Sequence, residues 1–171
     1  MAKNRPILPF ALVLCLFFAA SALAGPTEAD ERVEAFLDET TALFGPTEAE
    51  VARHLGAPRE RQVTPFTSPH DDATYEIITL LYDGVTVSLY SLDGGSRQFY
   101  HQIRVTAGPT CFARSICLGT PRERLTATLG QPEEVEDNLW RYSDMSGYNE
   151  LEFTFNAQGA IEAMTWTAEA D

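Results

Sequence analysis

The residue types that could carry catalysis or bind a metal ion are few and scattered in this sequence. His70-Asp71-Asp72 could ligate a metal ion, although such a trio is also common in solvated loops. His54 and His101 have no obvious partner nearby in the sequence. Ser115 lies outside any G-x-S-x-G turn and has no histidine close to it in sequence. We therefore predict no catalytic residue, no metal site and no cofactor.

Carboxylates are the most abundant chemical group in the chain. The 171 residues include 25 acidic and 12 basic side chains, for a formal net charge of −13. Such a surface excludes binding to nucleic acid or to anionic membranes, which both require basic residues, whereas it can steer a basic partner. The run Glu133-Glu134-Glu136-Asp137 is typical of a solvated loop, although a glycosidase-like pair of carboxylates could lie among so many acids.

Aromatic side chains are the strongest indication of a binding surface. Six of them lie on or beside predicted strands: Tyr90, Tyr100, Trp140, Tyr142, Tyr148 and Trp166. Tyrosine and tryptophan supply much of the binding energy at protein interfaces, although aromatic rings more often pack in a core. We predict binding through Tyr90, Trp140 and Tyr142.

The N-terminal residues read as an export signal. Lys3 and Arg5 precede an apolar run of about 14 residues, shorter than the ~20 that span a bilayer. Ala22 and Ala24 then form an A-x-A cleavage site, so we expect residues 1–24 to be removed and the mature chain to be periplasmic or secreted. An uncleaved anchor and a lipoprotein carrying its lipid on Cys15 are alternatives.

Two cysteines, Cys111 and Cys117, belong to the expected mature chain. An even number of cysteines in an exported protein favours a disulfide. The alternatives are a redox pair, which usually has two intervening residues rather than the five present here, and a metal pair. We predict a structural disulfide between them.

An internal match organises the mature chain. Residues 45–58 and 119–132 align without a gap at an offset of 74, with identical glycine, leucine and proline positions. Thr47 with Glu50, and Thr120 with Glu123, fit the capping-box pattern at a helix start. A glycine and then a proline end each predicted helix. The spacing therefore predicts the same short helix twice.

Strands follow each of these predicted helices. The first set is expected at residues 75–82, 85–92 and 98–106, and the second at 139–142, 150–155 and 161–167. A further helix is expected over residues 27–44, with Val33, Phe36, Leu37, Thr40 and Phe44 on one face. The predicted fold is α+β, with two tandem repeats of a helix plus a three-stranded antiparallel sheet and helices on one sheet face. The first repeat with the N-terminal helix would occupy residues 25–108, and the cystine segment with the second repeat 109–171.

The turn Asp83-Gly84 predicts which residues of the first hairpin share a face. A two-residue turn opposes Tyr82 and Val85, so the apolar set Ile78, Leu80, Tyr82, Val85, Val87 and Leu89 should meet the helices. The opposite face would carry Ile77, Thr79, Leu81, Thr86, Ser88 and Tyr90. Half of this second set is polar, so this face is the one free to meet water or a partner.

A glycine-capped helix ending in Leu-Gly-x-Pro and followed by antiparallel strands, twice in an exported chain, resembles the β-lactamase-inhibitor-protein fold. The single unit is similar to the small lipoprotein of the outer-membrane β-barrel assembly machinery. The resemblance spans about residues 26–168 and implies a protein that binds another protein through its sheet and catalyses nothing. This chain lacks a lipobox and has one mature cystine, fewer than the inhibitors, so no partner identity is implied. The alternatives are a small-ligand or peptide-binding protein with a pocket between repeats, and an unrecognised hydrolase.

Overall fold

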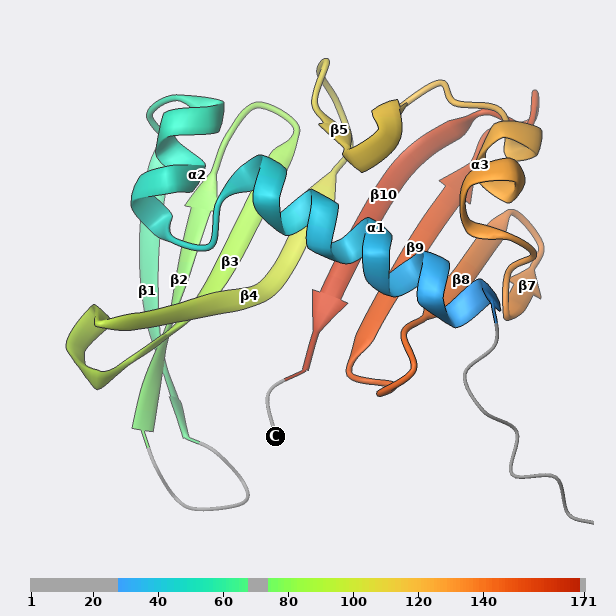
Figure 1. The fold of residues 1–171 in the computed structure, drawn as a ribbon. Coiled ribbons are helices and arrows are strands. Elements are labelled where there is room, and N and C mark those ends of the chain that lie inside the picture. The colour runs from blue at the N-terminus through green and yellow to red at the C-terminus, as the bar shows by residue number, and fades with distance from the viewer. Residues whose placement is uncertain (1–27, 68–73, 170–171) are drawn as a thin grey trace, which may run out of the picture.

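The computed structural model describes residues 28–67 and 74–169 (Figure 1). The predicted signal peptide, Cys15, the cleavage site before Gly25 and the His70-Asp71-Asp72 trio lie outside the described residues. The helices are α1 Glu28–Phe44, α2 Glu48–Leu55 and α3 Arg122–Leu129, with 3-10 turns η1 Asp93–Gly95 and η2 Ala113–Ser115. The strands are β1 Glu60–Thr67, β2 Thr74–Leu81, β3 Val85–Leu92, β4 Arg97–Val105, β5 Cys111–Phe112, β6 Ile116–Cys117, β7 Glu134–Glu136, β8 Leu139–Ser143, β9 Asn149–Phe155 and β10 Ile161–Ala168.

Eight of the strands form one continuous antiparallel sheet in the order β1-β2-β3-β4-β10-β9-β8-β7. The sheet is two four-stranded meanders that meet where the last strand, β10, pairs with β4. This confirms the α+β class. The prediction of three strands after each short helix is wrong, because β1 and β7 add an outer strand at each edge.

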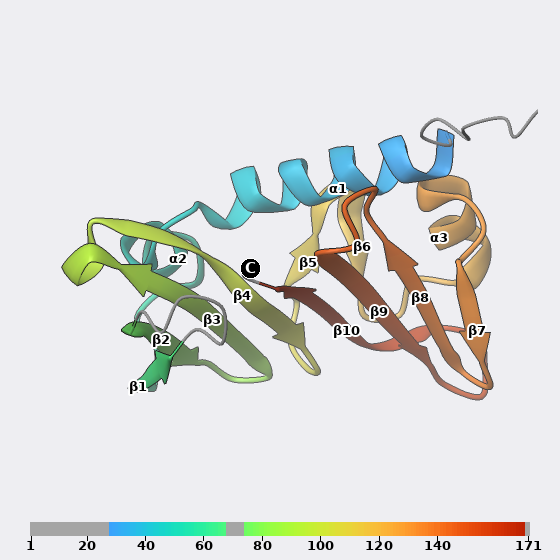
Figure 2. The same ribbon diagram turned by 90° about the horizontal axis from the view of Figure 1, so that it is seen from below.

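The helices lie on one side of this sheet and leave the other side uncovered (Figure 2). Helix α1 crosses both meanders and contacts α2, α3, β8 and η2. Its buried residues are Val33, Phe36, Leu37, Thr40 and Phe44, the set that its 3.6-residue period predicts. One core cluster joins them to apolar residues of both halves of the sheet. In the described part of the chain, no helix is both long enough and apolar enough to cross a bilayer.

The two short helices keep the sequence offset. Helix α2 begins at Glu48 and α3 at Arg122, so their starts differ by the same 74 positions as the sequence match. Both end at a glycine with positive φ, Gly56 at 88° and Gly130 at 93°. Each glycine N–H donates to a carbonyl four residues back, at 2.9 Å and 2.8 Å. Such backbone angles strain any residue with a side chain, which explains why both segments of the match have glycine at this position.

The starts of the two helices differ, however. Thr47 caps α2, where its hydroxyl accepts from the Glu50 N–H at 3.4 Å and donates to the Glu50 carboxylate at 2.7 Å. Pro121 occupies the cap position of α3 and offers no side-chain bond. Thr120 instead accepts from the Cys117 N–H at 3.0 Å. The predicted threonine cap is therefore present at α2, with the Glu50 carboxylate bonded to the Thr47 hydroxyl, and the prediction is wrong at α3.

A small hairpin made by β5 and β6 carries the two cysteines. The sulfurs of Cys111 and Cys117 lie at bonding distance, 1.97 Å. Phe112 between them is buried, with ring centroids 6.3 Å from Phe36 and 6.2 Å from Phe44 of α1. The hairpin is thus fastened to the helix that crosses both halves of the sheet.

Candidate binding surface

The uncovered side of the sheet, called here the open face, is built from alternate residues of its strands. In the first hairpin Ile77 opposes Tyr90 and Leu81 opposes Thr86, as the two-residue turn predicts. Their neighbours Ile78, Leu80, Val85, Val87 and Leu89 are buried under the helices. The sheet pleat therefore separates a fully packed side from an open side that still carries large apolar groups.

Four rings gather on the open face over β1, β3 and β4. This aromatic cluster consists of Phe66, Tyr90, Phe99 and His101. The Tyr90 ring is its centre, at centroid distances of 5.7 Å from Phe66, 5.1 Å from Phe99 and 4.8 Å from His101. Tyr90 is only 5% exposed although no helix covers it, whereas Phe99 is 40% exposed. The Tyr90 ring is therefore buried within the open face, whereas Phe99 is exposed to solvent.

A β-bulge brings two of these rings together. The register between β3 and β4 shifts between Ser88 and Leu89, so Tyr90 opposes Phe99 while Ser88 opposes Gln102. His101 is the extra residue on β4, and its ring packs on Tyr90. Within the described residues its buried Nδ1 has no hydrogen-bond partner. Bulges redirect side chains in this way.

Beyond the junction of β4 and β10, the open face carries charged side chains instead of aromatic rings. On β8 and β9, Arg141 opposes Glu152, and Ser143 opposes Glu150. Arg141 donates to Glu152 at 3.0 Å and to Glu134 at 2.8 Å, and it also pairs with Glu136 at 3.4 Å. The carboxylate cluster formed by Glu134, Glu136, Glu150 and Glu152 therefore surrounds one arginine.

The carboxyl of Glu150 is partly desolvated and lies near other carboxylates. Partial burial raises its pKa above the ordinary value, and the nearby charge of Glu152 raises the pKa further. Arg141 opposes this shift without cancelling it. The net effect is that the folded chain disfavours the ionised form of Glu150.

The three predicted binding residues do not share a surface. Tyr90 lies on the open face, within the aromatic cluster. Trp140 opposes Phe153 and Tyr142 opposes Leu151, and both partners are fully buried on the helix side. Trp140 and Tyr142 therefore face the helix side, opposite to Tyr90, so the three predicted residues cannot form one binding surface.

The helix-side rings have structural contacts of their own. Tyr142 is 2% exposed and its hydroxyl donates to the Gly130 carbonyl at 3.3 Å. The Arg122 guanidinium lies 5.4 Å from the Trp140 ring centroid. Burial raises the pKa of the Tyr142 hydroxyl well above its usual value. These contacts place both rings in the core and its margin.

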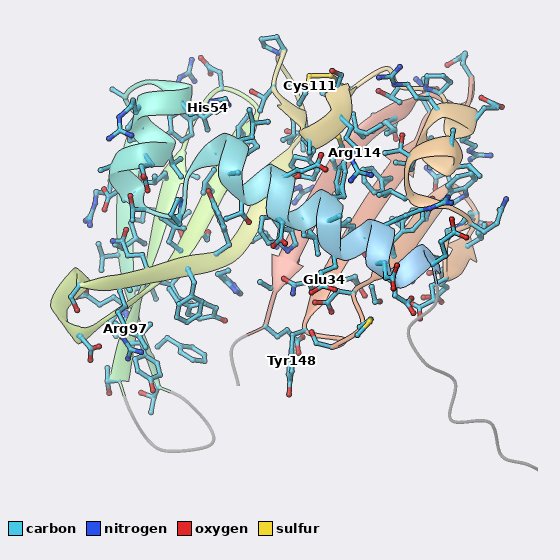
Figure 3. All side chains as sticks on the ribbon, viewed as in Figure 1. Glu34, His54, Arg97, Cys111, Arg114 and Tyr148 are labelled. Carbon is cyan, nitrogen blue, oxygen red and sulfur yellow. A yellow bond between two sulfur atoms is a disulfide. The ribbon has the colours of Figure 1, made fainter. Side chains whose placement is uncertain are left out.

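The remaining predicted aromatics also divide between core and loop. Tyr100 and Trp166 are buried, with ring centroids 5.0 Å apart, and Tyr100 donates to the Gly45 carbonyl. Tyr148 lies in the β8–β9 loop, is 43% exposed and points away from the sheet (Figure 3). Sequence reasoning missed Phe66 and Phe99. Of these two residues, only Phe99 lay on a predicted strand. Its spacing of two residues from His101 would place both side chains on the same side of that strand.

One hollow of the described residues lies beside two helices. Its volume is about 300 Å³, and it opens to solvent where α1 meets α2, between Phe44, Gly45, Glu50 and His54. The His54 ring packs against Phe44 there, at a centroid distance of 5.1 Å. Across residues 28–67 and 74–169, no three or more histidine, cysteine, aspartate or glutamate side chains are grouped so as to hold a metal ion.

Comparisons with known proteins supply little beyond this geometry. No protein-family model matches the sequence, and neither does any curated protein. Among solved structures, the chain is similar to a DUF4309 family protein (YjgB) from Bacillus subtilis. The two share 17% identity with a TM-score of 0.39, over 84% of this chain and 100% of that one.

Proposed function

We propose that this chain is an exported, non-enzymatic module that binds another protein through the open face of its sheet. The observation that carries the proposal is the aromatic cluster, which sits on the side of the sheet that no helix covers. The Phe99 ring is exposed to solvent, and it packs against the buried Tyr90 ring. An exposed aromatic patch with a packed base is typical of the anchor region of a protein interface.

The packing of the sheet supports a binding role for this side in particular. The helix side is completed by α1, α2, α3 and the cystine hairpin, so its apolar residues are already buried. The open side keeps Ile77, which opposes Tyr90, and Leu81, further along β2, half-buried. A partner that covers these groups would remove apolar surface from water, which contributes about 25 cal/mol for each Å² buried.

We also propose that the chain is built from two tandem units. The support is the common offset of 74 between α2 and α3, their glycine ends, and the four strands that follow each helix. Two such units joined edge to edge through β4 and β10 present one long face instead of two short ones. This arrangement accords with the resemblance to the β-lactamase-inhibitor-protein fold, whose sheet forms the binding surface.

Export is part of the same proposal. The A-x-A site before Gly25 and the apolar run before it indicate a cleaved signal peptide. A bonded Cys111–Cys117 pair persists in oxidising compartments such as a periplasm or the extracellular space. The partner would therefore be an envelope or extracellular protein.

A matched pair of variants tests the binding face. Phe99 on the open face is 40% exposed, and Leu43 at the end of α1 is 42% exposed. Immobilised wild-type, Phe99→Ala and Leu43→Ala chains would be incubated with an envelope extract, and the retained proteins quantified by mass spectrometry. We expect Phe99→Ala to reduce retention of the specific partner roughly tenfold or more, and Leu43→Ala to leave it unchanged.

The opposite pattern would contradict the proposal. Loss of the partner with Leu43→Ala, at full retention with Phe99→Ala, would place binding on the helix side. Both variants change exposed side chains, so their melting temperatures should stay close to that of the wild type. A large decrease for Phe99→Ala alone would make that ring part of the fold instead of the interface.

A further inference from the structure

The open face consists of two chemically different halves that meet at the junction of β4 and β10. The half over β1–β4 carries the aromatic cluster. The half over β7–β10 carries the carboxylate cluster around Arg141. Both belong to one continuous sheet, so a single bound partner can cover both.

Charges on this face are unbalanced. The second half holds the four carboxylates of Glu134, Glu136, Glu150 and Glu152, with Arg141 as the cation among them. The nearest strand of the first half adds Arg104, which opposes Thr165 of β10. Even with this second arginine the carboxylates are in excess, and the chain as a whole carries −13.

The Arg141 network leaves carboxylate groups available to a partner. Its shorter contacts go to Glu134 and Glu152, whereas Glu136 is 3.4 Å away and its side chain is 67% exposed. Glu150 is also exposed, and its raised pKa shows that its surroundings disfavour the ionised form. An incoming cation would lower the electrostatic free energy of both groups.

We propose that the partner of the open face is a basic protein surface, which sets arginine or lysine side chains on the carboxylate cluster and an apolar group on the aromatic cluster. This inference rests on the proposed function and specifies the chemistry of its partner. Complementary charge would raise the association rate and fix the orientation of the complex. Arginine suits both halves, because its guanidinium pairs with carboxylates and stacks on aromatic rings.

A selection experiment with a defined probe tests the partner chemistry. A phage-displayed library of random 12-residue peptides would be selected on the full chain and counter-selected on Phe99→Ala. The surviving peptides then depend on the aromatic cluster. We expect arginine and lysine to be enriched in them relative to the unselected library.

Synthetic copies of the survivors would then be titrated against matched variants. Glu136→Gln/Glu150→Gln removes two charges from the open face and keeps the two shorter Arg141 pairs. Glu31→Gln/Glu34→Gln removes two exposed charges from α1, on the other side of the sheet. We expect the first double variant to bind roughly tenfold more weakly and the second to bind within about twofold of the wild type.

The possible failures are distinguishable. If survivors lack basic enrichment, or bind Glu136→Gln/Glu150→Gln as tightly as wild type, the partner chemistry is overturned while the aromatic face still binds. If the α1 double variant weakens binding equally, the attraction reflects only overall charge, and the inference is again overturned. If no peptide survives counter-selection, binding does not use Phe99, and the proposed function fails together with this inference.

Discussion

Two neighbouring side chains of β8, Tyr142 and Arg141, lie on opposite sides of the sheet. Tyr142 packs edge-on against Phe153, with ring centroids 5.9 Å apart, and bonds to the end of α3. Arg141 beside it reaches the carboxylates of the open face. The sequence could predict that neighbouring residues of β8 face opposite sides, but not which of them faces the helices. The loop between β8 and β9 is too long to fix the register as Asp83-Gly84 does for β2 and β3.

The placement of Tyr142 predicts a structural role that can be measured. Tyr142→Ala should lower the free energy of unfolding by about 3–5 kcal/mol, because it leaves a cavity in the core. Tyr142→Phe should cost only about 1 kcal/mol, the value of a hydrogen bond. Denaturant titration of both variants provides the measurement. A stable Tyr142→Ala chain with weakened partner binding would show that the ring belongs to the interface.

Glu150 predicts a pH-dependent effect on stability. Its pKa is raised in the folded state, so the folded chain holds this proton more tightly than the unfolded chain. The stability contribution of this group therefore falls as pH rises from its ordinary pKa through the raised value. Glu150→Gln should raise the melting temperature at pH 7 and leave it unchanged at pH 3. Glu34→Gln on α1 controls for the loss of one exposed carboxylate, and equal changes in both variants would contradict local crowding.

At the scale of elements, the cystine hairpin depends on α1 for its position. The Ala113 N–H donates to the buried Thr40 hydroxyl at 3.2 Å, and Arg114 forms a two-bond ion pair with Glu39 at 2.7 Å and 2.9 Å. The hydrogen bonds from Arg114 hold the pKa of Glu39 below its usual value. The disulfide, the buried Phe112 ring and these polar contacts together close the hairpin onto the helix.

Loss of the disulfide should lower the stability of the chain by a measurable amount without unfolding it. Cys111→Ser/Cys117→Ser should lower the free energy of unfolding by about 2 kcal/mol, the chain-entropy value for a small ring. In the exported wild-type chain both thiols should resist alkylation until a reductant is added. Two alkylated cysteines in the untreated chain, seen by mass spectrometry, would contradict the bond.

Some elements could be predicted from the sequence because their signals are local. The apolar period of α1, the turn Asp83-Gly84 and the two glycine helix ends each depend on a few adjacent residues. The edge strands β1 and β7 lack such a signal. Nearly all their residues are exposed, so burial imposes no alternation on them, and Pro65 argues against a strand. The bulge at His101 and the pairing of β4 with β10 depend on contacts distant in sequence.

At the scale of the whole molecule, the described residues form an eight-stranded sheet with a helix crossing both of its halves and one uncovered face. The two halves share a core, and α1 contacts elements of both. The aromatic and carboxylate clusters therefore keep fixed positions relative to each other. A partner that contacts both clusters requires such fixed positions. The sequence could predict an acidic chain of α+β class, but not where its exposed rings lie, because that depends on β1 and on the bulge.

The export proposal predicts the start of the mature chain. The exported protein should begin at Gly25, since Ala22 and Ala24 occupy the two critical positions before it, just after the apolar run. N-terminal sequencing and intact mass of the exported protein provide the measurement. Retention of Met1, or a lipid on Cys15, would contradict cleavage at this site.

Site-specific photo-crosslinking in intact cells tests the central claim most directly. A benzophenone amino acid would replace Phe99 on the open face in one chain and Leu43 on α1 in another, two positions of nearly equal exposure. If the open face binds a protein, irradiation should join position 99 to one discrete partner and position 43 to none. A discrete partner at position 43, with none at position 99, would contradict binding through the open face.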